Sequence, residues 1–342
     1  MEKTDRIIFL DFITGAGLIL IIISHIGFLS EYLETPVSSV MPISFGIIGN
    51  LLFFFRSGFG LYKSDKPDWL LFFRRRLTRV IPALFMTTAV ITVMALFFFD
   101  PLKLGFDGRL NFKTFAANAF GVQEFLNISR INPITWFISY LLLYYSLFPA
   151  LHKLISKTMP KFFIWSFLIF LFTFFISNIK DYSYLPNISY YLIAFVFGLF
   201  FARVLSEFRA KKFYKITLVI VITGIAISYA LFKFTLLFAH AEMLNILIYA
   251  NNLMIATALI TLSSLVNFSH LISNFLNFIS KYAYYIFLVH IPVIESLNNI
   301  NNAAKFAVYF ILWCTFFSFI LERLDNVANS LITNKDYSNT FK

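Results

Sequence analysis

The sequence predicts an all-α polytopic membrane protein of about ten transmembrane helices, with both termini in the cytoplasm. Three observations predict this class. Of the 342 residues 59% are apolar and only 13% are charged, whereas soluble domains carry about 25% charged residues. Apolar runs of about 20 residues, the length that crosses the hydrocarbon core, recur along the chain. Lysine and arginine also lie mostly on alternate connections between these runs.

The apolar runs define the elements in order. We expect spans near residues 7–29, 41–61, 80–99, 133–151, 161–179, 187–204, 215–236, 243–265, 276–294 and 303–321. The first run is too long for a signal-peptide core and is kept as a span. The longest connection, 100–132, has room for an interfacial or re-entrant helix. We therefore expect one transmembrane domain over 1–325 and a cytoplasmic tail over 326–342.

The basic residues set the orientation. With the N-terminus inside, 20 of the 28 lysines and arginines fall on cytoplasmic segments and 6 on outer ones, as the positive-inside rule predicts. The net charge of +11 thus reflects topology, and we expect no nucleic-acid partner. The single cysteine, Cys314, excludes disulfides and thiolate metal clusters, and we expect no metal.

The first span carries two ionisable residues, Asp11 and His25. Such groups inside a bilayer are costly and mark candidate functional sites. At about 100° per residue, Asp11, Thr14 and His25 lie near one face of a helix. Gly15 and Gly17 beside that face would let another helix approach closely. The alternative is a structural His and Asp that neighbouring helices satisfy.

Basic residues mark the next two spans. Arg56 lies inside the second span, at a depth that matches Thr14 and one turn from Asp11, so we expect an Asp11–Arg56 pair. Arg76 and Arg79 share a face where the third span begins, and guanidinium groups at a helix N-terminus suit phosphates. The alternative for this arginine cluster is a topology signal that touches anionic lipid.

Two later stretches complete the candidates. Trp136, Tyr140 and Tyr144 recur at every fourth residue of the fourth span, a pattern that also fits simple aromatic packing. His290 lies near the outer end of the ninth span, at a depth comparable to that of His25, so the two histidines could meet in one cavity.

Together these motifs resemble the acyltransferase-3 family of integral membrane O-acyltransferases, which acylate surface carbohydrates. The resemblance extends from residue 6 to residue 292 with the motifs in family order. The matching residues are Asp11 and His25; Ser57, Gly58 and Phe59; Arg75, Arg76, Arg79, Ile81 and Pro82; Trp136 and Pro149; and Ala283, Tyr284, Phe287, Leu288, His290 and Pro292.

The chain departs from the family pattern at three positions. Thr14 stands where the family usually has a basic residue, Leu141 where many members have Glu, and Arg56 where an apolar residue is usual. Because Thr14 and Arg56 match in depth, our hypothesis is that the basic function moved from the first span to the second.

The resemblance implies transfer of an acyl group, most simply acetyl from cytoplasmic acetyl-CoA, to a hydroxyl of a surface or lipid-linked glycan. Acceptors of this kind include lipopolysaccharide, capsule and exopolysaccharide, in a bacterial inner membrane. It makes His25 the general base or a transient acyl carrier, and the residues do not separate these roles. The supporting residues that we expect with it are Asp11 and His290 for catalysis; Arg75, Arg76 and Arg79, and outside the family pattern Arg56, for the donor acyl-CoA; and Ser57, Trp136 and Tyr284 along the substrate cavity.

Two other functions compete with this interpretation. A transporter could export a glycan or small anion without chemistry, although transporters often show paired halves and this sequence has no convincing repeat. A family member that has lost catalysis and only binds lipid-linked sugars is also compatible with Thr14 and Leu141.

Overall fold

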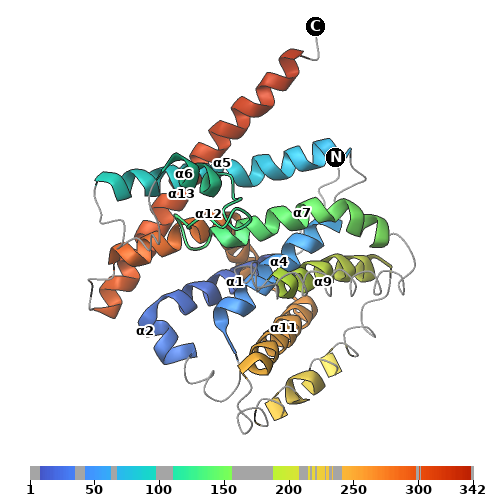
Figure 1. Cartoon of the computed structure of the whole chain (residues 1–342). Helices are drawn as coiled ribbons and strands as arrows, with labels where there is room; N and C mark the ends of the chain where they lie inside the picture. The colour runs from blue at the N-terminus through green and yellow to red at the C-terminus, as the bar shows by residue number, and fades with distance from the viewer. Residues whose placement is uncertain are drawn as a thin grey trace. The chain divides into compact units, whose positions relative to one another are not determined.

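The computed structural model describes residues 8–34, 43–62, 68–97, 111–155, 188–207, 241–297 and 302–339, with residue 300 and a few positions between 215 and 233. Most of these residues are helical, and none of them forms a strand (Figure 1). The helices are α1 Ile8–His25, α2 Gly27–Leu29, η1 Ser30–Glu34, α4 Phe45–Tyr62, α5 Trp69–Phe97, α6 Phe112–Ala119, α7 Thr135–Ile155, α9 Ile188–Glu207, α11 Ala241–Leu265, α12 His270–Leu297 and α13 Ala303–Asn339.

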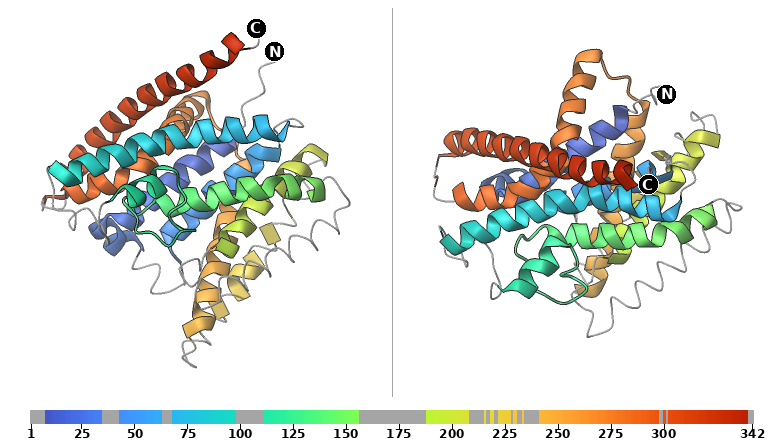
Figure 2. Two further views of the ribbon diagram at one scale, coloured as in Figure 1. Left: turned by 45° about the horizontal axis from the view of Figure 1, so that its top comes forward. Right: turned by 90° about the horizontal axis from the view of Figure 1, so that it is seen from above.

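The helices agree with most of the predicted spans. Eight of the ten predicted spans coincide with α1, α4, α5, α7, α9, α11, α12 and α13. The predicted span 161–179 lies outside the described residues, and 215–236 lies largely outside them. The connection 100–132 contains a helix, α6, as predicted. The expected boundary at residue 325 falls inside α13, which continues as one helix in both views of Figure 2.

The helical surfaces fit a multi-pass membrane protein. Within the described residues, six helices are long and apolar enough to cross a membrane: α1, α4, α5, α9, α11 and α13. The exposed side chains of α13 are largely apolar, among them Val308, Ile311, Leu312, Trp313, Phe316 and Phe319. Apolar side chains are stable in that position against lipid. The count of ten spans and the cytoplasmic termini stay predictions.

The chain divides into two compact units, residues 1–65 with 150–281 and residues 66–149 with 282–342. In the first unit, α4 packs against both α1 and α9. Gly17 of α1 and Gly49 of α4 form the close contact between these two helices: a Cβ on Gly49 would lie 2.5 Å from the Gly17 carbonyl oxygen. The helix contact that we predicted at Gly17 is therefore confirmed.

The contact between α4 and α9 is closer still. A Cβ on Gly58 would collide with the Phe195 carbonyl oxygen, and one on Gly198 would collide with the Phe55 carbonyl oxygen. Two glycines thus let the backbones of α4 and α9 touch, the arrangement typical of membrane helix pairs. Gly58 also belongs to the motif that resembles the family pattern, and the structure gives it a packing role.

We expect Gly58→Ala to destabilise the first unit strongly, because the added methyl group has backbone, not a movable side chain, in its way. Overpacking of this kind costs about 1–3 kcal/mol. Gly60→Ala is the matched control on the same helix, since a Cβ there meets nothing within 4 Å. Thermal unfolding of the purified protein in detergent measures both. Equal melting temperatures for the two variants would contradict the glycine contact.

The second unit holds α5, α6, most of α7, the end of α12, and α13. Tyrosine hydroxyls on α12 join its helices: Tyr284 donates to the Val80 carbonyl of α5 at 2.8 Å, and Tyr285 donates to Asp325 of α13 at 2.8 Å. Helix α13 also packs along α5, and the two run side by side in Figure 2.

Helix α5 corrects one expectation. We placed its start near residue 80, with Pro82 in the first turn, but the helix begins at Trp69 and continues through Pro82. The apolar residues Trp69, Leu70, Leu71, Phe72 and Phe73 precede the arginines, and together with them extend the helix by about three turns. Arg76 and Arg79 therefore lie inside a helix, and the argument from a helix N-terminus does not apply to them.

Candidate functional site

The polar residues of α1 lie in the first unit. Asp11 and Thr14 are both 4% exposed, and the Thr14 hydroxyl donates to the Leu10 carbonyl at 2.6 Å. His25 is the last residue of α1, and its side chain is exposed. The sequence-predicted base is therefore accessible to a substrate, while Asp11 lies buried near the opposite end of the helix.

A carboxylate that the sequence analysis missed lies within electrostatic range of His25. Glu34, the last residue of η1, interacts electrostatically with the imidazole. Its oxygens accept hydrogen bonds from the Phe45 backbone N–H at 3.1 Å and the Ser30 hydroxyl at 3.3 Å. These two bonds hold Glu34 between α1 and the start of α4. A carboxylate at this range stabilises the charged form of an imidazole. The chain turns sharply after α1, and only that turn brings residue 34 back to residue 25.

Arg56 of α4 lies at the level of Asp11 and Thr14 on the neighbouring helix α1. The contacts Gly17–Gly49 and Ser24–Gly46 show that α1 and α4 run antiparallel, and extending their register places Arg56 opposite the turn from Asp11 to Thr14. The matching depth is thus confirmed. The Arg56 guanidinium donates to the Ser280 hydroxyl of α12 at 3.5 Å. The Asp11–Arg56 pair stays a prediction.

The register makes the hypothesis of a relocated basic residue testable. We expect Arg56→Leu to lose activity, because a buried site would lose its positive charge, and we expect Thr14→Arg in the same protein to restore it. Thr14→Arg alone serves as the control for crowding at this buried position. Acyl transfer by membranes that contain equal amounts of each variant is the measurement. Full activity of Arg56→Leu would refute the hypothesis.

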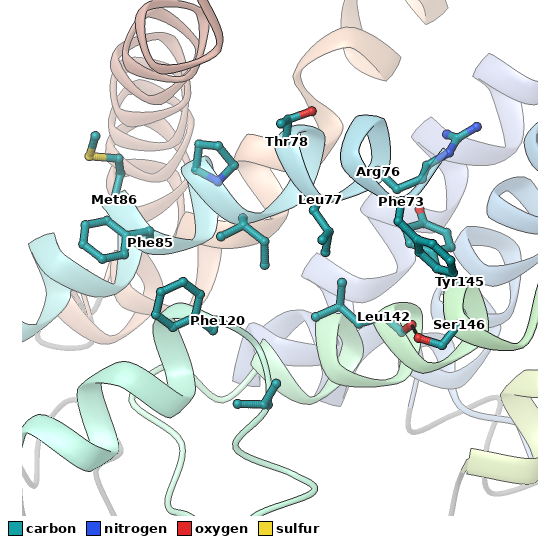
Figure 3. Close-up of a pocket in the computed structure, with 13 residues that line it drawn as sticks. Phe73, Arg76, Leu77, Thr78, Phe85, Met86, Phe120, Leu142, Tyr145 and Ser146 are labelled. Carbon is teal, nitrogen blue, oxygen red and sulfur yellow. Dashed lines mark hydrogen bonds between the residues drawn. The ribbon is translucent and has the colours of Figure 1, made fainter. Parts of the chain in front are cut away.

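The second unit contains a cavity of about 650 Å³. Helix α5 forms one wall and α7 another, and the turn after α6 closes one end. Figure 3 shows Arg76 and Tyr145 toward one end and Phe85, Met86 and Phe120 toward the other. Its lining is mostly apolar, with Thr78 and Ser146 as further polar groups. A cavity of this kind can hold an extended, largely apolar chain with an anionic group near Arg76.

The arginine cluster divides in the structure. Arg76 is half-buried and lines the cavity, and its guanidinium lies 5.6 Å from the Phe72 ring centroid and 6.0 Å from that of Tyr145. Arg75 and Arg79 are exposed and do not line the cavity. Of the predicted donor-binding arginines, Arg76 thus has the position best suited to a ligand in this cavity.

Pro82 adds an acceptor to the same cavity wall. Proline has no backbone N–H, so the carbonyl one turn earlier in a helix, that of Thr78, lacks its usual helical donor. Thr78 and Pro82 both line the cavity. The Thr78 carbonyl therefore lacks its helical hydrogen bond on the helix that forms this wall.

The remaining predicted residues are packed in the second unit. Trp136 and Tyr140 form an edge-to-face pair with centroids 5.4 Å apart, so these two residues of the predicted stripe pack on each other. Tyr284 bonds to Val80 and does not line the cavity. His290 is fully buried, and its Nδ1 lies 2.7 Å from the Phe287 carbonyl oxygen. Because a carbonyl only accepts, Nδ1 carries the proton and Nε2 is the basic nitrogen. A meeting of His290 with His25 stays a prediction.

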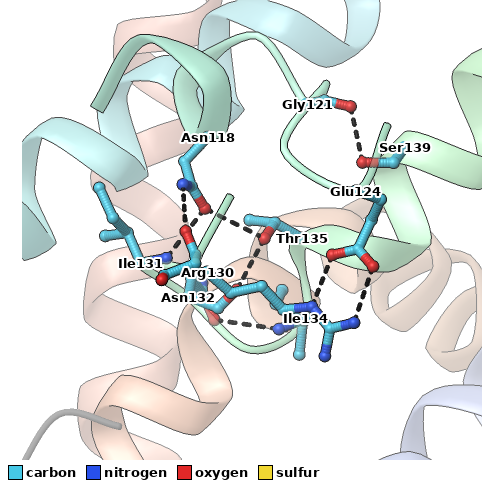
Figure 4. A network of polar contacts seen from close by, with 10 residues as sticks. Asn118, Gly121, Glu124, Arg130, Ile131, Asn132, Ile134, Thr135 and Ser139 are labelled. Carbon is cyan, nitrogen blue, oxygen red and sulfur yellow. Dashed lines mark hydrogen bonds and ion pairs between the residues drawn. The ribbon is translucent and has the colours of Figure 1, made fainter. Parts of the chain in front are cut away.

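A polar network that the sequence analysis also missed shapes the segment before α7 (Figure 4). The Asn118 side-chain amide donates to the carbonyls of Thr114 and Ser129, and its oxygen accepts from the Ile131 N–H at 2.9 Å. Arg130 forms a bidentate ion pair with Glu124 at 2.6 and 2.7 Å.

The network also fixes α12. Asn132 donates to the Leu288 carbonyl at 2.8 Å, two residues before His290. The polar run NISRINP ahead of Trp136 was the available signal, since such residues beside an apolar span need partners.

Comparison with known proteins gives one match. The sequence model of the acyltransferase-3 family, described as an acyltransferase domain, matches residues 7–322. No curated protein and no solved structure matches the chain significantly.

Proposed function

The chain belongs to the acyltransferase-3 family and is a membrane acyltransferase, and on that premise we propose that it transfers an acetyl group from acetyl-CoA to a hydroxyl of a surface or lipid-linked glycan. The observation that carries the donor assignment is the cavity with Arg76 at one end. A guanidinium suits the phosphates of coenzyme A, and the apolar lining suits its extended arm.

His25 supplies the base in this proposal. Its imidazole takes the proton of the acceptor hydroxyl while the hydroxyl oxygen attacks the thioester carbonyl carbon. The C–S bond breaks, the coenzyme A thiolate leaves and receives the proton, and the products are the ester and free coenzyme A. The neutral imidazole is the form that can take this proton. A transient acyl-imidazole at His25 gives the same products in two steps.

The test uses the glycan itself. Surface glycan is isolated from a deletion strain that carries either an empty vector or the gene, and its proton NMR spectrum is recorded. O-acetyl signals that appear only with the gene support the proposal, and the shifted ring protons identify the acceptor hydroxyl. Unacylated glycan in both strains, with a changed amount at the surface, would support a transporter and overturn the proposal.

A further inference from the structure

The cavity of the second unit is a groove between α5 and α7. Phe72 of α5 stacks on Phe148 of α7 with ring centroids 5.1 Å apart, and the Arg76 guanidinium lies 6.0 Å from the Tyr145 ring centroid. The contacts move forward along α5 as they move back along α7, so the two helices are antiparallel. From Arg76 the groove continues toward the later residues of α5 (Figure 3).

The turn after α6 bounds this groove at its other end. Gly121 lies between the two helices, since a Cβ there would lie 3.1 Å from the Ile138 side chain of α7 and 3.3 Å from the Leu84 side chain of α5. On either side of Gly121, Phe120 and Val122 line the cavity. These three residues, 120–122, form what we call the end wall.

The backbone of the end wall is held in place. The Val122 N–H donates to the Ala117 carbonyl at 2.9 Å, and the Gly121 carbonyl accepts from the Ser139 hydroxyl of α7 at 2.7 Å. Gly121 has a φ of +68°, a conformation that glycine adopts without steric cost. Because a packed and hydrogen-bonded wall yields little, an added methylene against it is felt.

The length of the groove matches the arm of coenzyme A. Leu84, which contacts the end wall, is eight residues after Arg76, about 12 Å along α5. The arm that joins the pyrophosphate of coenzyme A to its sulfur has the chain length of about four amino-acid residues, about 14 Å when extended. With the phosphates at Arg76, the sulfur therefore reaches the end wall, and the acyl group meets Phe120.

We propose that the end wall limits the length of the acyl group and so selects acetyl-CoA over donors with longer chains. This rests on the proposed function and adds to it the residues that select the acyl group. Phe85, Met86 and Phe120 line this end of the groove, and their apolar side chains suit the methyl group of an acetyl. A longer chain has to displace Phe120, and one methylene too many costs about 10- to 200-fold in kcat/KM.

Phe120→Ala tests the end wall, and Phe125→Ala is its matched control. Phe120 is 53% exposed and Phe125 is 38% exposed, so both truncations should leave the fold intact. Both residues follow α6, but only Phe120 lines the cavity. Wild type and the two variants are compared in nanodiscs with acetyl-, butyryl- and hexanoyl-CoA. The measurements are kcat/KM for transfer to oligosaccharides released from the surface glycan, and the melting temperature with each donor and no acceptor.

We expect kcat/KM of wild type to fall at least tenfold from acetyl-CoA to butyryl-CoA. Phe120→Ala should remove most of this fall, Phe120→Leu should give an intermediate ratio, and Phe125→Ala should keep the ratio of wild type. Acetyl-CoA should raise the melting temperature of wild type. Hexanoyl-CoA should raise that of Phe120→Ala by about 2 °C or more and leave that of wild type unchanged.

Two results would overturn the inference: equal use of the three donors by wild type, or the same fall with chain length in wild type and Phe120→Ala. Failure of the proposed function gives a different result. In that case no variant transfers an acyl group to the oligosaccharides, while hexanoyl-CoA still stabilises Phe120→Ala and not wild type.

Discussion

His25→Ala is expected to lower the rate of acyl transfer about 10²- to 10⁴-fold, the usual contribution of a positioned general base. Its exposed position at the end of α1 means that the loss should be chemical and not structural. The melting temperature and the amount of protein in the membrane should stay those of wild type. The measurement is the single-turnover rate with radiolabelled acetyl-CoA and purified acceptor.

The carboxylate of Glu34 provides a second variant that tests His25 as the base. Glu34→Gln keeps one oxygen that can accept from the Phe45 N–H and gains an amide that can donate to the Ser30 hydroxyl, but it removes the charge. It should therefore lower the rate less than His25→Ala. If His25→Ala retains more than about a tenth of the wild-type rate, His25 is not the base.

Arg76→Leu is expected to raise the KM for acetyl-CoA about 10- to 100-fold, because a charged hydrogen bond contributes about 1.5–3 kcal/mol. The KM for the acceptor should change little, since the contact proposed for Arg76 is with the donor. Arg76→Lys should recover only part of the loss, because an ammonium group lacks the planar fork that holds phosphate. Initial rates over a range of acetyl-CoA concentrations measure the effect.

Arg74→Leu is the matched control. Arg74 is exposed on the same helix and does not line the cavity, yet its replacement removes the same charge. A similar rise in KM for both variants would show that the arginine cluster attracts the donor only through its summed charge, and the assignment of Arg76 to a specific phosphate contact would be wrong.

Much of the fold could be predicted from the sequence, because a span in lipid is recognisable from its own composition. Runs of about 20 apolar residues need no partner to be identified, and Gly17 indicated a close helix contact before any packing was known. Matching the depths of Thr14 and Arg56 required only the rise per residue and alternating helix directions. Run lengths and residue spacings along the chain were enough to predict these features.

The missed features depend on contacts between distant parts of the chain. Glu34 reaches His25 only because the chain turns after α1, and the role of Asn132 depends on the Leu288 carbonyl, 156 residues away. The start of α5 was misplaced because the arginines interrupt its hydropathy, while the backbone continues as a helix through them. Arg75, Arg76 and Arg79 looked equivalent in sequence, and only the packing of α7 against α5 distinguishes Arg76.

Helix α13 has a mechanical consequence. It runs for 37 residues, about 55 Å at 1.5 Å per residue, whereas the hydrocarbon core is about 30 Å thick. When the helix stands upright in the bilayer, nearly half of it, about 25 Å, therefore extends beyond the hydrocarbon core. Hydrogen bonds from Tyr282 to Glu322 and from Tyr285 to Asp325 brace it against α12. A fluorescent protein fused to its end would be held away from the bilayer, with space to fold.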